Sequence, residues 1–171
     1  METNESFDAQ QLLALEIAFR KRVETFIEHD LKKAIENKEH EMLFPPDYSS
    51  VDLSQYQDLN SLKDYLFENN RKVYIVYSKK DVRDAIEQGQ EAIYPGNKKM
   101  EKALKFITRH QKTETFSPWG AVRLSGPIIV VLAGMALILV LGLTAILRNT
   151  ETEITRNADG TFTLKTKRPP K

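Results

Sequence analysis

The feature that most constrains this chain is an uninterrupted apolar run from Pro127 to Leu147, in which Thr144 carries the only hydroxyl group. The run is 21 residues long, counting 127 to 147 inclusively, and contains no charge. At about 1.5 Å per residue, a helix of this length spans roughly 30 Å, the thickness of a bilayer's hydrocarbon core. Lipid offers no hydrogen-bond partner to backbone groups, so such a segment must be helical. The run predicts a transmembrane helix over 127–147 and a single-pass membrane protein.

The flanks of this run predict its orientation. Basic residues stand at both ends, Arg123 before it and Arg148 after it, so the positive-inside count is nearly balanced. The chain before the run shows no signal peptide, and the lysine-rich segment 97–112 favours an N-terminus in the cytoplasm. The competing interpretation keeps the basic tail inside. Trp119, Arg123 and Arg148 are predicted to anchor the chain at the membrane interface, although Trp119 would also suit an ordinary linker at 117–126.

Charge and cysteine content limit the classes of function. Residues 1–116 contain 18 Lys/Arg and 21 Asp/Glu, net −3, whereas residues 148–171 contain 6 and 3, net +3. Neither part is basic enough to indicate nucleic acid as a partner. The chain has no cysteine, which excludes disulfides, thiolate chemistry and cysteine metal sites. We expect four regions: a soluble domain, an interfacial linker, the transmembrane helix and a short tail, at 1–116, 117–126, 127–147 and 148–171.

Apolar residues recur at three- and four-residue spacing near the N-terminus and predict one long helix over 7–38, with Ser6 as its N-cap. Pro45 and Pro46 cannot continue a helix, so 39–50 is expected to be a connection. An apolar stripe of this length has two explanations. It packs on its own domain, or part of it meets another helix in an oligomer or a partner.

The middle of the chain predicts alternating helices and strands. Ser78 and Asp81 resemble a capping box, and Gly89 is a suitable residue to end the helix that they begin. Asn97 is expected to cap the next helix, which continues to about Gln111. The expected order is a helix, a strand, a helix, a strand and a helix, at 59–67, 73–77, 79–88, 91–94 and 97–111. The two strands would be parallel, because a helix connects them.

The last of these helices carries a stripe of cations on the side opposite its apolar residues. The stripe consists of Lys98, Lys102, Lys105, Arg109 and Lys112. One interpretation is a surface that binds lipid headgroups or a partner, where each cation near an anionic membrane contributes on the order of 1 kcal/mol. The other is a solvated helix face. Nucleic acid is not favoured, because no aromatic residues alternate with the lysines.

The tail reads as a β-hairpin over 151–167, since residues 157–160 (Asn-Ala-Asp-Gly) are typical of a turn. In its second strand Phe162 and Leu164 fall on one face. An isolated hairpin is marginal in water. We expect Phe162 and Leu164 to dock on another protein's sheet; otherwise the hairpin stays mobile.

No catalytic motif is present. Of the three histidines, His40 would share a helix face with Glu36 if the first helix extended that far, but no third ligand at metal-binding spacing accompanies them. We therefore predict no catalytic residue, no metal and no cofactor, and a protein that is not an enzyme. The expected fold is α+β and mostly helical, with an N-terminal helix, a small β-α-β-α domain, one transmembrane helix and a hairpin-like tail.

The predicted function is that of a non-catalytic, bitopic accessory or scaffold subunit of a larger membrane protein complex. Its partners would be other membrane-protein subunits or further copies of the chain, bound through the N-terminal domain and the tail. The alternative is a membrane-tethered regulator or sensor whose basic helix 97–112 binds anionic lipid.

Overall fold

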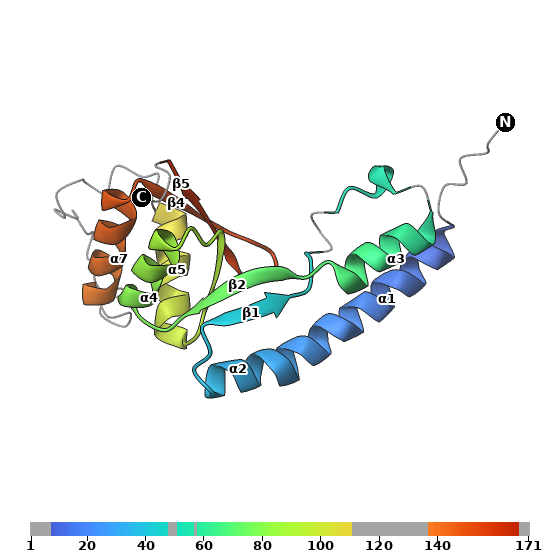
Figure 1. Cartoon of the computed structure of the whole chain (residues 1–171), viewed down its shortest axis with the longest axis horizontal. Coiled ribbons are helices and arrows are strands. Elements are labelled where there is room, and N and C mark those ends of the chain that lie inside the picture. The colour runs from blue at the N-terminus through green and yellow to red at the C-terminus, as the bar shows by residue number, and fades with distance from the viewer. Residues whose placement is uncertain (1–7, 48–50, 57, 111–136, 168–171) are drawn as a thin grey trace. The chain divides into compact units, whose positions relative to one another are not determined.

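The computed structural model describes residues 8–47, 51–56, 58–110 and 137–167 (Figure 1). The chain is α+β and divides into two compact units, residues 1–72 and 73–171. Five strands form a mixed sheet in the order β1-β2-β3-β5-β4. The predicted domain 1–116 thus covers the first unit and the beginning of the second, and the predicted linker 117–126 lies outside the described residues.

A long helical segment dominates the first unit. It consists of α1 (Ala9–Thr25), the π-helical segment η1 (Phe26–Leu31) and α2 (Lys32–Glu36), which confirms the helix predicted over 7–38. The N-cap is Asp8 rather than Ser6. The Asp8 carboxylate accepts from the Gln10 amide, and the Gln11 side chain accepts from the Asp8 amide, so two backbone donors that the helix leaves open are satisfied.

The inner face of α1 packs on α3 (Leu59–Glu68). Leu15 and Phe19 of α1 are buried with Leu62 and Leu66 of α3. Arg22 donates two hydrogen bonds to carbonyl oxygens in the last turn of α3. A cation at this end of a helix offsets the partial negative charge of its free carbonyls, so Arg22 joins the two helices electrostatically.

The segment between the helices differs from the prediction in two details. Glu41–Phe44 forms strand β1 within the segment expected to be a connection, and Leu53–Gln55 forms the 3₁₀-helix η3. The N-cap of α3 is Asp58, whose carboxylate accepts from the Ser61 amide at 2.7 Å. The sequence predicts Asn60 or Ser61 as this cap, but both lie inside the helix, whereas Asp58 has the extended backbone dihedrals of a cap.

The second unit contains most of β2 and all later elements. In chain order these are β2 (Arg71–Val76), α4 (Lys79–Glu87), β3 (Ala92–Pro95), α5 (Lys98–His110), α7 (Leu137–Asn149), β4 (Thr152–Arg156) and β5 (Phe162–Thr166). Strands β2 and β3 are parallel, as predicted. The capping box of Ser78 and Asp81 is confirmed, Gly89 follows α4 with a φ of 71°, and Asn97 accepts from the Met100 amide at 2.8 Å.

The tail forms the predicted hairpin from β4 and β5. Its turn is held by Asn157, whose amide donates to the Thr161 carbonyl at 2.8 Å, and by Gly160, whose φ of 86° few other residues adopt. Strand β5 pairs antiparallel with β3 and places Phe162 opposite Ile93. The hairpin therefore completes the chain's own sheet.

Helices α4, α5 and α7 are neighbours in the second unit (Figure 1), and they share one hydrophobic core with strands β2, β3, β4 and β5. Side chains from every strand of the second unit and from all three helices contribute to this core, among them Val76, Val82, Ile93, Leu104, Leu143, Ile154 and Phe162.

The transmembrane helix predicted over 127–147 is wrong. Helix α7 is 13 residues long, and it buries one face in the core of the second unit. The buried side chains, each at most 7% exposed, are Val140, Leu143, Ile146 and Leu147. Residues 127–136 lie outside the described range. Among the described residues, no helix combines the length and apolar character needed to cross a bilayer.

The physical reason is that the interior of a protein accepts an apolar helix as readily as lipid does. The single-pass location and the cytoplasmic N-terminus were inferred from the predicted span, so these predictions are corrected with it. The parts of the expected fold that remain are the α+β class, the N-terminal helix, the small β-α-β-α portion and the C-terminal hairpin.

Candidate functional sites

The basic stripe of α5 lies on the face opposite its buried residues. Met100 and Leu104 are fully buried, whereas Lys98, Lys102 and Arg109 are exposed. This follows from the helical period, which separates the two sets by about half a turn. Burial of the apolar face thus leaves the cations free to meet a ligand.

Lys105 is the most enclosed of the four stripe residues that the structure describes. Its ammonium group pairs with the Glu101 carboxylate one turn earlier, and its side chain is 32% exposed. The Thr108 hydroxyl donates to the Lys105 carbonyl at 2.9 Å. Burial raises the pKa of Tyr94, and repulsion from Glu101 raises it further. Tyr94 therefore remains uncharged at neutral pH beside Glu101.

Strand β4 supplies a further cation, because its side chains alternate between two faces. Thr152 and Ile154 are buried, and Arg156 has the same parity as these two. Since α5 packs on β4, Arg156 belongs to the face that meets this helix. Glu153 and Thr155 have the opposite parity.

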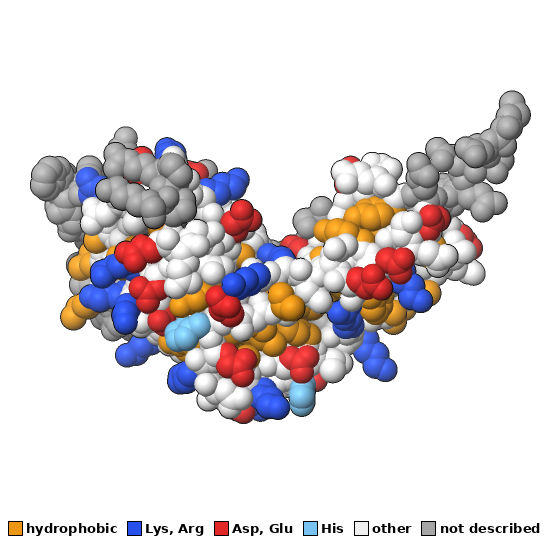
Figure 2. Space-filling model, viewed as in Figure 1, with side chains coloured by type: hydrophobic (Ala, Val, Ile, Leu, Met, Phe, Trp, Pro, Cys, Tyr) orange, Lys and Arg blue, Asp and Glu red, His pale blue; other side chains and the backbone are white. Residues whose placement is uncertain are grey.

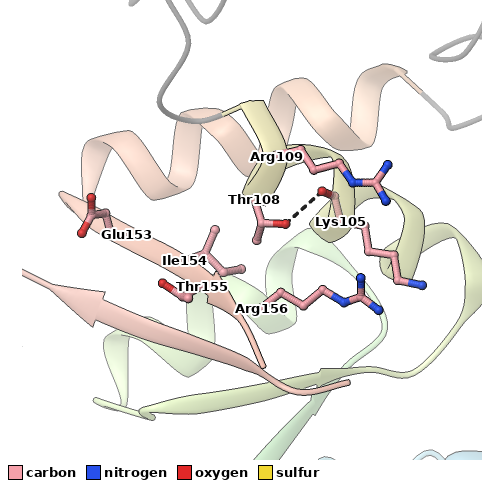
Figure 3. A pocket seen from close by; sticks show the side chains of 7 residues that line it. All are labelled: Lys105, Thr108, Arg109, Glu153, Ile154, Thr155 and Arg156. Carbon is pink, nitrogen blue, oxygen red and sulfur yellow. Dashed lines mark hydrogen bonds between the residues drawn. The ribbon is translucent and has the colours of Figure 1, made fainter. Parts of the chain in front are cut away.

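A groove of about 360 Å³ lies between α5 and β4, and we call it the basic groove. Its lining consists of Lys105, Thr108, Arg109, Glu153, Ile154, Thr155 and Arg156. In Figure 3 the charged ends of Lys105, Arg109 and Arg156 extend to one end of the groove, and Glu153 points to the other. Two separate elements thus concentrate positive charge at one end.

The first unit has a hollow of its own, of about 700 Å³, between its long helical segment and β1. Phe26, Met42, Leu43 and Pro45 give it apolar walls. Charged residues of both signs line it as well, namely Arg22, Asp30 and Glu41. This mixture of signs gives the hollow no clear charge preference.

The outer face of α1 is the second candidate surface. Leu13 and Ile17 lie one turn apart and are 57% and 60% exposed, although Leu15 and Phe19 of the same helix are buried. Figure 2 shows hydrophobic side chains at the surface along this helix, between charged ones. The helix is therefore apolar on two faces, and α3 covers only one of them.

The remaining residues predicted to be functional fall into three groups. Phe162 and Leu164, expected to dock on a partner, are 1% and 6% exposed in the core of the second unit. Arg148 is exposed in the last turn of α7, where it complements the helix dipole. Lys112, Trp119 and Arg123 lie outside the described residues.

Sequence reasoning missed Arg156 as a member of the basic site. Its two-residue spacing from Ile154 indicates that both side chains share a strand face. Nothing in the local pattern shows that this face meets α5, because that contact joins segments more than 40 residues apart. Within the described residues no group of three or more His, Asp or Glu is arranged to hold a metal ion.

The fold and the two surfaces define a two-unit α+β protein with a basic groove and an exposed apolar helix face. Comparison with protein-family models, with curated proteins and with solved structures finds no significant match. Function is therefore argued from the surfaces themselves.

Proposed function

We propose that this chain is a non-catalytic interaction protein whose first unit binds a helix of a partner protein through the outer face of α1. The observation that carries this proposal is the exposure of Leu13 and Ile17, four residues apart on one helix. Large apolar side chains grouped on a surface are a common mark of protein interfaces.

The surroundings of this pair support an interface between helices. Glu16 and Arg20 form an ion pair at 2.9 Å, with Ile17 between them in the sequence. An apolar centre with a charged rim is the usual composition of a protein interface. Side chains four residues apart are also the anchors by which one helix recognises another.

Another exposed apolar pair, Ile138 and Leu141, occurs on α7. Leu141 is 38% exposed, whereas both members of the α1 pair are more than half exposed. The α1 face is therefore the better-defined docking surface.

The test compares three forms of the full chain, each purified from its native source at native abundance. L13E/I17E places two carboxylates on the proposed face, and A18E places one carboxylate at another exposed position of α1. We expect identified proteins, or further copies of the chain, to co-purify with wild type and A18E and to be lost from L13E/I17E. A monomer that has no partner, or partners retained by all three forms, would contradict the proposal.

A further inference from the structure

The basic groove holds positive charge that the described residues do not neutralise. Arg109 and Arg156 come from different elements, and neither forms an ion pair with a described residue. Lys105, the third cation, is paired with Glu101. Like charges that face one groove repel each other, and a bound anion relieves this repulsion. The groove therefore favours a negatively charged ligand.

The number of arginines indicates which anion fits. A carboxylate has two oxygens, and one guanidinium fork can occupy both of them. A phosphate monoester has three terminal oxygens and a charge of about −1.5 to −2 at neutral pH. It can therefore accept from Arg109 and Arg156 at the same time, with an additional electrostatic contribution from Lys105.

The size of the groove indicates that the phosphate is attached to a larger group. Its volume of about 360 Å³ is at the lower end of the roughly 300–1,000 Å³ that is common for small-molecule sites. Phosphate itself would occupy only the end with the three cations. Thr108, Ile154 and Thr155 line the rest, with Glu153 at the opposite end, so there is room for a small organic group.

We propose that the basic groove binds a phosphate monoester, with Arg109 and Arg156 donating to the phosphate oxygens and Lys105 contributing charge. This site is independent of the helix-binding face of α1, because it lies wholly in the second unit. A soluble organic phosphate and a lipid headgroup share this chemistry, and the experiment distinguishes between them.

In the first arm, the full chain is titrated with phenyl phosphate at constant ionic strength, and calorimetry measures the binding. R109Q and R156Q each remove one fork, and R83Q removes an exposed arginine of α4 that does not line the groove. We expect each groove variant to weaken binding about tenfold, as the loss of a charge-assisted hydrogen bond does. R83Q should bind like wild type.

Thermal unfolding shows whether the variants remain folded, and R156K tests the geometry. R156K keeps the charge but loses the fork, so we expect its affinity to lie between those of wild type and R156Q. Equal affinity for phenyl phosphate in wild type, R109Q and R156Q would overturn the proposal. So would benzoate binding as tightly as phenyl phosphate.

The second arm uses flotation of the full chain with lipid vesicles. Phosphatidic acid carries a phosphate monoester, whereas phosphatidylglycerol is anionic but carries only a diester. Selective flotation with phosphatidic acid, lost in R156Q, identifies a headgroup as the source. Binding of phenyl phosphate without flotation identifies a soluble ligand. Equal flotation with both lipids, or tighter binding of an oligonucleotide that contains only phosphodiesters, would overturn the monoester assignment.

Discussion

Helices α7 and α1 use apolar side chains in different ways. Helix α7 comes from the most apolar part of the chain, and its buried face meets α4, α5 and β4. Helix α1 is far more polar, packs mainly on α3, buries Leu15 and Phe19, and leaves Leu13 and Ile17 at the surface. The more apolar helix is also the more buried one, and it packs against more elements. The apolar pair of α1 stays exposed because α3 covers the opposite face of that helix.

The largest expected effect comes from the same substitution in both helices. Leu143→Ala in α7 removes a fully buried side chain and should lower the free energy of unfolding by about 2–5 kcal/mol. Leu13→Ala in α1 removes one that is 57% exposed and should change it by no more than about 0.5 kcal/mol. Denaturant unfolding of the full chain measures both. Similar losses for the two variants would remove the distinction between the helices.

The next effect tests the inner face of α1. Arg22→Ala leaves two carbonyl groups of α3 without their donor and removes a guanidinium 5.2 Å from the centre of the Phe67 ring. We expect a loss of about 1–3 kcal/mol in the free energy of unfolding. Arg20→Ala, on the same helix, removes only an exposed ion pair and should cost less than about 1 kcal/mol. Equal costs would mean that Arg22 does not join α1 to α3.

A smaller effect tests the N-cap of α5. The Asn97 side chain accepts from the Met100 amide and donates to the Tyr77 carbonyl at 2.9 Å. Asn97→Ala should cost about 1 kcal/mol, which thermal unfolding detects. Asn97→Asp keeps the acceptor and loses the donor, so its cost should be lower. An alanine variant as stable as wild type would contradict the assigned cap.

The smallest effect concerns pH and the cap of α3. Hydrogen bonds from Ser61 lower the pKa of Asp58 below its usual value of 3.8. A lowered pKa stabilises the folded state above pH 3.8, and this contribution is lost as the pH falls through the folded-state value. Asp58→Ser retains a capping oxygen that does not titrate. Stability curves between pH 2 and 6 should therefore fall less steeply for this variant, and parallel curves would contradict the cap's titration.

Local signals predicted much of the fold. The ends of α4 and the start of α5 were predictable because local interactions determine them. The side chains of Ser78, Asp81 and Asn97 form hydrogen bonds to nearby backbone groups, and Gly89 adopts a positive φ. The four residues of β1 were missed, because strand pairing rather than composition selects so short a segment.

Long-range features could not be predicted. The pairing of β5 with β3 joins residues about 70 positions apart, so Phe162 and Leu164 were expected to meet another protein rather than Ile93 and its neighbours. The burial of α7 depends on the same assembly. An apolar run predicts that a helix is shielded from water. Only the tertiary structure shows whether the protein interior or lipid shields it. The cations that α5 contributes to the basic groove were predicted, but Arg156 of β4 was not.

Cysteine reactivity tests the central comparison most directly, because the natural chain contains no cysteine. Single variants I17C and L143C of the full chain would be treated with a thiol-specific maleimide under native conditions and in denaturant. We expect I17C to react nearly as fast in the folded protein as in the denatured one, and L143C to react only as the protein unfolds. Rapid labelling of folded L143C together with protection of I17C would contradict this expectation.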